Sequence, residues 1–191
     1  TAGAPAPHVI ASGSVFLRPI EPSDAPLYQR WRTDEAVTRL ASFPGPPPSL
    51  ADVEQRIARV SRDQGTESYA FLICLPAEDG RPIGEASLFH LDRDNGLAEL
   101  GIFLGEPEDW GKGYGTDAVT ALVDFGIGEL RFERIWLEVG TDNPRARRAY
   151  EKAGFVHEGT LRHDRYEHGE FTDGDVMSVL RDEWLIRRRQ A

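Results

Sequence analysis

The spacing of apolar residues in the first third of the chain predicts one strand followed by helices. Val15–Pro19 has the alternation of a strand. A helix with Ser23 as its N-cap is expected to run through Trp31, and a second short helix to cover Asp34–Leu40. After a Pro-rich loop, Ser49-Leu50-Ala51-Asp52 resembles a capping box and opens a further helical pattern.

The middle third of the chain has the pattern of three consecutive strands. Apolar or alternating runs cover Tyr69–Leu75, Arg81–Leu91 and Leu97–Leu104. Asp-Gly and Asn-Gly at the joints between these runs are signals of tight hairpin turns. The three strands are therefore expected to form an antiparallel meander.

In the last part of the chain, helical and strand patterns alternate. A helix is predicted over Thr116–Leu130, a strand over Ile135–Val139, a helix from Asn143 to Gly154, and a closing hairpin of Phe155–Tyr166 with Glu170–Leu180. The predicted order is β-α-α-βββ-α-β-α-ββ. This order indicates a mixed α/β domain, with helices packed on a partly antiparallel sheet.

Composition limits the classes of protein that need to be considered. With 191 residues, 40% of them hydrophobic, the chain is expected to form one domain over 13–186, with a flexible N-terminal tail at 1–12 and a basic C-terminal tail at 187–191. The net charge of −10 argues against nucleic-acid binding. The single cysteine excludes an intrachain disulfide, and no apolar run is long enough to span a membrane. We expect a cytoplasmic protein.

A glycine-rich segment, Trp110-Gly111-Lys112-Gly113-Tyr114-Gly115-Thr116, lies between a predicted strand and a helix N-terminus. Glycines leave the backbone N–H groups open to a ligand, and the first turn of a helix adds free donors and the positive end of its dipole. The segment therefore predicts a pyrophosphate site.

Two nucleotide motifs compare poorly with this segment. A P-loop would need a glycine at Glu106 and a hydroxyl residue at Gly113. A dinucleotide fingerprint fits Gly113-x-Gly115-x-x-Ala118, with Glu138 on a later strand, but the loop Glu106–Asp109 separates the preceding strand from the first glycine. An NAD(P)-binding oxidoreductase remains a remote alternative.

The segment instead resembles motif A of the GNAT superfamily of N-acetyltransferases, with Trp110 in place of the usual Gln or Arg. That variant is similar to the branch that acetylates ribosomal-protein N-termini. Motif B of the superfamily is also matched, by Asn143, Tyr150, Glu151, Lys152, Gly154 and Phe155. Ala146 stands where Ser is common. The resemblance implies the GNAT fold, with a central, mostly antiparallel, splayed seven-stranded sheet and about four helices.

The resemblance also implies acetyl-CoA as cosubstrate and a set of residues that bind it. Backbone groups of Ile102, Phe103 and Leu104 would pair with the pantetheine arm as an added strand. The loop residues Trp110, Gly111, Lys112, Gly113, Tyr114, Gly115 and Thr116 would hold the pyrophosphate. Asn143 would contact the pantetheine, and Arg148 and Lys152 the phosphates.

The reaction implied is direct attack of a primary amine on the thioester in a ternary complex. The resemblance assigns Tyr150 as the acid that protonates the departing thiolate. We expect the base to be Glu99, whose pKa burial on a strand would raise. Asp164, Glu167 and an ordered water molecule are the alternatives.

The acceptor stays open at this point. The Trp110 variant favours a peptide or protein α-amine, and small amines such as polyamines, aminoglycosides or metabolites are the alternative. A non-catalytic acyl-CoA sensor on the same fold is a further alternative. With one cysteine and no H-x-x-x-H pair, we expect no metal site. We also expect no membrane and no nucleic acid as partner. A homodimer is expected because relatives are often dimers.

Overall fold

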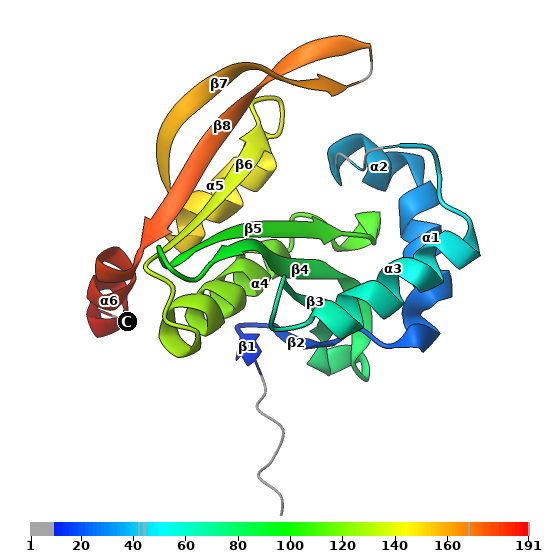
Figure 1. Cartoon of the computed structure of the whole chain (residues 1–191), viewed down its shortest axis with the longest axis horizontal. Helices are drawn as coiled ribbons and strands as arrows, with labels where there is room; N and C mark the ends of the chain where they lie inside the picture. The colour runs from blue at the N-terminus through cyan, green and yellow to red at the C-terminus, as the bar shows by residue number, and fades with distance from the viewer. Residues whose placement is uncertain (1–9, 42, 44, 168, 191) are drawn as a thin grey trace, which may run out of the picture.

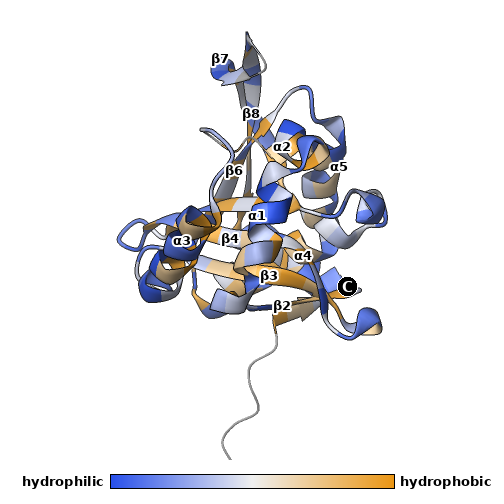
Figure 2. Ribbon diagram, turned by 90° about the vertical axis from the view of Figure 1, so that its right-hand side faces the viewer, coloured by the Kyte–Doolittle hydropathy of each residue, from blue (hydrophilic) through white to orange (hydrophobic). Residues whose placement is uncertain are grey.

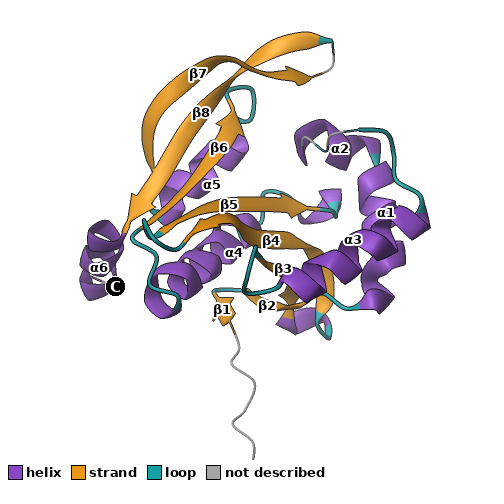
Figure 3. Cartoon of the chain, in the orientation of Figure 1, coloured by secondary structure: helices purple, strands orange, loops and turns teal. Residues whose placement is uncertain are grey.

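The computed structural model describes residues 10–41, 43, 45–167 and 169–190. Eight strands form one sheet in the order β1-β2-β3-β4-β5-β6-β8-β7, flanked by six α-helices (Figure 3). The mixed α/β fold is confirmed. The predicted seven strands and about four helices are corrected to eight and six within the described residues.

The strands follow the predicted positions closely from β2 onward. Their bounds are β1 Ile10–Ser12, β2 Val15–Pro19, β3 Tyr69–Leu75, β4 Arg81–Asp92, β5 Leu97–Leu104, β6 Arg134–Gly140, β7 Val156–Glu167 and β8 Glu170–Leu180. Neighbouring strands pair antiparallel, except for β5 and β6, which are parallel.

The helices are α1 Ala25–Thr33, α2 Glu35–Ala41, α3 Leu50–Asp63, α4 Tyr114–Val123, α5 Pro144–Ala153 and α6 Arg181–Gln190. A π-helical turn, Asp124–Glu129, follows α4 directly. The predicted caps of α3 and α5 are confirmed: the Ser49 hydroxyl accepts from the Asp52 N–H, and the Asn143 side chain from the Ala146 N–H. In place of Ser23, the predicted N-cap, a short 3-10 turn precedes α1.

Two hydrophobic cores lie on opposite faces of the sheet, and alternate residues of β3 contribute to each. Phe71, Ile73 and Leu75 belong to the larger core, which also holds the buried face of α4. Ala70, Leu72 and Cys74 belong to the second core. That core is completed by α1 and α3, whose hydrophilic outer faces are seen in Figure 2. The alternation explains why β3 is apolar throughout, since both of its faces are covered.

Parts of both predicted tails form regular secondary structure. Ile10–Ser12, placed in the predicted flexible tail, forms β1 against β2, and the turn between them is held by the Ser14 N–H donating to Asp117 of α4 at 2.9 Å. The rest of that tail lies outside the described residues. At the other end, the basic residues 187–189 form the last turn of α6. The Trp184 indole attaches α6 to Asp124 at 2.6 Å.

The parallel pair β5–β6 is short, and its end shapes the rest of the molecule. Leu97 lies opposite Arg134 and Glu99 opposite Trp136, after which the strands diverge within the described part of the sheet. The hairpin β7–β8 follows β6 away from β5, so that Figure 1 shows a fork between the two halves of the sheet. Among the described residues no helix combines the length and apolarity that a bilayer crossing requires.

The close approach of β4 and β5 can be tested at Gly84. A Cβ at this position would lie 2.2 Å from the Phe103 carbonyl oxygen, whereas a Cβ at Gly159 of β7 would meet nothing within 4 Å. We expect Gly84→Ala to lower the free energy of unfolding by about 1–3 kcal/mol, because the backbone must move. Gly159→Ala should change it by less than about 0.5 kcal/mol. Chemical denaturation measures both, and equal stabilities would contradict the tight strand pairing.

Candidate active site

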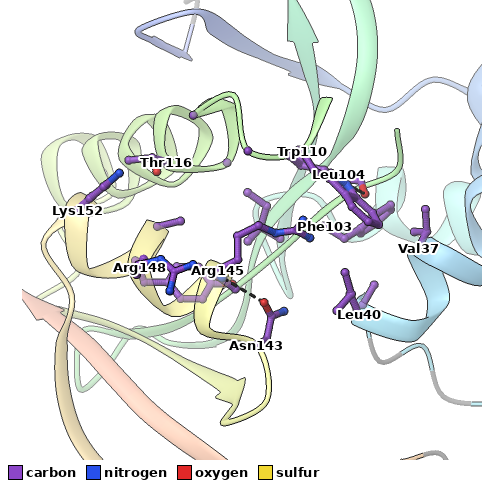
Figure 4. Close-up of a pocket in the computed structure, with 18 residues that line it drawn as sticks. Val37, Leu40, Phe103, Leu104, Trp110, Thr116, Asn143, Arg145, Arg148 and Lys152 are labelled. Atoms are coloured by element: carbon purple, nitrogen blue, oxygen red, sulfur yellow. Dashed lines mark hydrogen bonds between the residues drawn. The ribbon is translucent and has the colours of Figure 1, made fainter. Parts of the chain in front are cut away.

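Two cavities meet where β5 leaves β6. The first, of about 410 Å³, lies between β5, the Gly-rich loop, α2 and α5. Predicted residues that line it are Ile102, Phe103, Leu104, Trp110, Gly111, Gly113, Gly115, Thr116, Asn143, Arg148, Tyr150 and Lys152. We call it the loop cavity; Figure 4 shows its lining.

The Gly-rich loop has the geometry of an anion site. Gly111 and Gly113 adopt φ values of 79° and 94°, which glycine reaches without strain. Gly113 is the residue before α4, and a Cβ at either glycine would meet no atom within 4 Å. The first N–H groups of α4 therefore face an open cradle, at the positive end of the helix dipole.

Cations from α5 complete the loop cavity. Arg148 and Lys152 lie on its wall as predicted, and so does Arg145, which sequence reasoning did not select. Figure 4 shows Arg145 extending across the cavity toward Trp110, and its guanidinium carbon lies 4.5 Å from the centroid of that ring. The loop with these three side chains fits the phosphates of CoA in charge and in donor groups.

Lys112 and Tyr114, both predicted to hold the pyrophosphate, do not line the loop cavity. The Lys112 ammonium donates to buried Asp109 at 2.9 Å, and Asp109 also accepts from Arg81 of β4 at 2.8 Å. Burial acts to raise the pKa of Asp109, but the hydrogen bonds from Lys112 and Arg81 outweigh it and hold that pKa below its usual value. Lys112 thus anchors the loop, and the Tyr114 side chain packs against the larger core.

The open edge of β5 carries the backbone groups of alternate residues. The Leu104 carbonyl accepts from the Trp110 indole at 3.0 Å on the side away from β4. Because the N–H and C=O of one strand residue point to the same edge, Ile102 shares this open edge with Leu104. The Phe103 carbonyl instead lies against Gly84 of β4. Of the three residues predicted to pair with pantetheine through their backbone, Phe103 therefore has its backbone groups directed toward β4 and not toward the open edge.

The second cavity, of about 300 Å³, lies on the other side of β5 and extends to β4, α3 and β7. We call it the acceptor cavity. Seven residues line both cavities, Tyr150 and Asn143 among them, so the two spaces adjoin at these side chains. Asn143 has its Oδ1 engaged as the cap of α5. Burial raises the pKa of Tyr150 to about 12, so its hydroxyl keeps its proton at neutral pH.

Two carboxylates from the strands that diverge lie in the acceptor cavity. Glu99, the predicted base, contacts His90 Nδ1 at 2.7 Å and has a side chain 15% exposed. Glu138 of β6, which the sequence analysis considered only as part of a dinucleotide fingerprint, lies in the same cavity. Burial raises the pKa of Glu138, and the charges of Asp164 and Glu99 raise it further against the opposite effect of Arg165.

The alternative bases lie on β7. Asp164 is bound to the neighbouring Arg165 at 3.2 Å. Glu167 pairs with Glu170 near the end of the hairpin, and its side chain lies outside what the structure describes. Within the described residues, no group of three or more His, Cys, Asp or Glu side chains is arranged to hold a metal ion.

Comparison with known proteins identifies the family of this chain. The family model of the acetyltransferase (GNAT) domain matches residues 14–156, which include the loop cavity and most of the acceptor cavity. This chain belongs to the GNAT acetyltransferases. It is therefore an N-acetyltransferase that uses acetyl-CoA and an amine acceptor, and the oxidoreductase alternative is wrong.

Several GNAT proteins resemble this chain over most of their length. The uncharacterized N-acetyltransferase p20 of Bacillus licheniformis is 29% identical over 170 residues, 88% of this chain and 93% of that protein. The spermidine N(1)-acetyltransferase of Escherichia coli K12 is 26% identical over 176 residues, 92% and 91% of the two chains. The crystal structure of the Vibrio cholerae spermidine N-acetyltransferase, in complex with CoA and spermine, has a TM-score of 0.81 at 24% identity. It covers 90% of this chain and 98% of that one, and shows the shared fold.

The anchor of the Gly-rich loop can be tested at Asp109. Asp109→Asn removes the charge that holds Lys112 and Arg81, so we expect the Kd for CoA to rise about tenfold or more, because the loop is no longer preorganised. The control is Glu78→Gln, since Glu78 also pairs with Arg81 but is half exposed. Calorimetric titration with CoA measures both variants. Unchanged affinity in folded Asp109→Asn would contradict the anchoring role.

Proposed function

We propose that this GNAT enzyme transfers the acetyl group directly to a primary amine bound in the acceptor cavity, within a ternary complex. The observation that carries the proposal is the junction of the two cavities at Tyr150. A cosubstrate held by the Gly-rich loop and the β5 edge would bring its thioester to this junction. The amine would reach it from the opposite side, through a space lined by both carboxylates and arginines.

The open edge of β5 orients the acetyl donor in this proposal. Acetyl-CoA supplies an acetyl thioester, and the Ile102 backbone groups would pair with its pantetheine amides as a neighbouring strand does. Arg145, Arg148 and Lys152 would balance the phosphate charges. Tyr150, neutral over the physiological pH range, would donate its proton to the departing sulfur.

The proton of the attacking ammonium needs an acceptor, because only the neutral amine is a nucleophile. A lysine-like amine has a pKa near 10.4 and an α-amine a pKa near 7.7–8.0. At neutral pH the lysine-like amine is therefore harder to deprotonate and depends more on a base. Glu138 and Glu99 are the carboxylates of the acceptor cavity that lie on the two diverging strands, and we assign the main role to Glu138. Its raised pKa brings it nearer to that of the amine than an ordinary carboxylate.

Two acceptor classes follow from different observations. Relatives named spermidine N-acetyltransferases, together with the carboxylates Glu99, Glu138 and Asp142 in the acceptor cavity, support a polyamine. The Trp110 form of motif A supports a peptide or protein α-amine. A panel of peptides, polyamines, aminoglycosides and amino acids, followed by release of free thiol from acetyl-CoA, separates them. A melt stabilised by acetyl-CoA without thiol release from any amine would contradict the catalytic proposal.

Three further expectations remain proposals. We propose that residues 13–186 act as one catalytic domain, that the enzyme works in the cytoplasm, and that it forms a homodimer. Size measurements of the purified chain by light scattering test the last of these.

The acid role of Tyr150 predicts a specific kinetic change. Tyr150→Phe removes the proton donor and keeps the ring that packs on Phe155. We expect kcat to fall by about 10²–10⁴-fold, with little change in the Kd for CoA. Tyr166→Phe, at an exposed tyrosine of β7, is the matched control and should leave kcat unchanged. A kcat in Tyr150→Phe close to that of the unaltered enzyme would assign the acid role elsewhere.

The base role of Glu138 predicts a change in the pH profile. Glu138 must lose its proton to act, and its pKa is raised, so kcat/KM should fall as pH is lowered through that pKa. Glu138→Gln should remove this acid limb and lower kcat/KM by about 10²–10⁴-fold. Glu99→Gln is measured in parallel, and Glu151→Gln, half exposed on α5, serves as control. If Glu99→Gln alone abolished the acid limb, the base would be Glu99.

A further inference from the structure

The outer strand of the closing hairpin, β7, departs from regular pairing beside the acceptor cavity. Residues 162–164 of β7 lie opposite the single residue Asp173 of β8. This bulge is held by the His163 N–H, which donates to Asp173 Oδ1 at 2.8 Å, and His163 adopts a φ of 51°. A positive φ is uncommon outside glycine, and bulges often redirect a side chain next to a functional site. Arg165 is the first residue of β7 to pair with β8 again after the bulge.

Arg165 lies on the wall of the acceptor cavity, between two carboxylates. Its Nε donates to Asp164 Oδ2 at 3.2 Å, and its Nη2 lies 3.7 Å from Glu138 Oε2. The side chains of Arg165 and Glu138 are only 24% and 29% exposed, so water screens this pair less than it screens an ion pair on the surface. Arg165 is thus a cation that one carboxylate anchors beside another.

The anchor itself is fixed by β8. A Cβ at Gly174 would lie 2.5 Å from Asp164 Oδ2, so the Asp164 carboxylate packs directly on the glycine backbone. Gly174 does not have a positive φ, and the position therefore uses the small size of glycine and not its conformational freedom. The bulge and this glycine together determine where Asp164 and Arg165 lie.

The charges near Glu138 come from several elements. Besides Arg165, the charged or titratable groups are Asp164 of β7, Glu99 of β5 with its partner His90 of β4, Asp142 after β6, Arg39 of α2, and the pair of Arg56 from α3 with Glu85 from β4. Burial raises the pKa of Glu138, Asp164 and Glu99 raise it further, and Arg165 lowers it. Burial likewise raises the pKa of Tyr150, and Arg165 again acts in the opposite direction. The Arg165 charge therefore acts on both the proposed base and the proposed acid.

Resting on the proposed function, we propose that Arg165 is the positioning residue of Glu138: held by the β7 bulge and Asp164, it orients this carboxylate for the acceptor amine. The separation of 3.7 Å is longer than a hydrogen bond, so the carboxylate oxygens stay available to the amine. When the ammonium N–H bond breaks, the proton forms an O–H bond with Glu138, which leaves both the amine and the carboxyl group neutral. Arg165 acts through Glu138 and not on the amine.

Removing the Arg165 cation should move the acid limb of the pH profile. In Arg165→Gln the pKa of Glu138 rises further, so more of the base is protonated at each pH on the limb. We expect kcat/KM on the limb to fall about tenfold. Above the limb Glu138 is ionised in both enzymes, and kcat/KM should stay within about threefold of the unaltered value. A misfolded variant would instead lose activity at every pH.

Two further variants complete this experiment. Arg165→Lys keeps the charge and should return the acid limb toward its original position. Arg162→Gln makes the same substitution at an exposed arginine of β7 and should leave the profile unchanged. An acid limb at the same pH in Arg165→Gln as in the unaltered enzyme would overturn the inference and leave Glu138 as the base.

A measurement without turnover separates this inference from the base role. NMR titration follows the Glu138 carboxyl carbon, which is identified by the loss of its signal in Glu138→Gln. A midpoint at higher pH in Arg165→Gln, with Arg162→Gln unchanged, would support the inference. If the acid limb then proved to belong to Glu99, only the base role of Glu138 would be contradicted. Equal midpoints in Arg165→Gln and the unaltered enzyme would overturn the inference whatever the activity.

Discussion

The divergence of β5 from β6 after Glu99 is the constraint on which the site depends. A strand that loses its neighbour exposes backbone donors and acceptors, which are costly to leave unpaired away from water. Here the Trp110 indole satisfies the Leu104 carbonyl, and the Ile102 groups face the loop cavity. The same divergence lets α5 bring Tyr150 to the gap from the opposite face of the sheet. The fold thus creates the open edge of β5 and the meeting point of the two cavities in one step.

Most of the fold could be predicted because its elements are locally encoded. The strands from β2 onward and the caps of α3 and α5 follow from alternation and from short-range hydrogen bonds. The two missed elements lack such signals. Strand β1 has three residues, and α6 is mostly charged and has no fully buried side chain. Both are held by contacts with residues distant in the chain, through Asp117 for β1 and Asp124 for α6.

The candidate site also has one part that could be predicted from the sequence and one part that could not. The anion cradle could be predicted from sequence, because glycines before a helix form it with their own backbone. The roles of single side chains could not, since each depends on a distant partner: Lys112 is bound by Asp109, which is also held by Arg81. Glu138 likewise becomes a candidate base only through its burial and the nearness of Asp164 and Glu99. No spacing in the sequence places these three carboxyl groups together.

Charge gives the clearest contrast between the whole chain and its site. The net charge of −10 favours cationic partners at long range, where the summed field acts and salt screens it. Inside the acceptor cavity, charges act at short distance and away from bulk water, so individual pairs matter more than the net charge. Arg56 and Glu138, which line the same cavity, each have a partner of opposite charge, Glu85 at 2.9 Å and Arg165 at 3.7 Å. The distribution of charge along the cavity depends on such pairs, which the composition of the chain does not reveal.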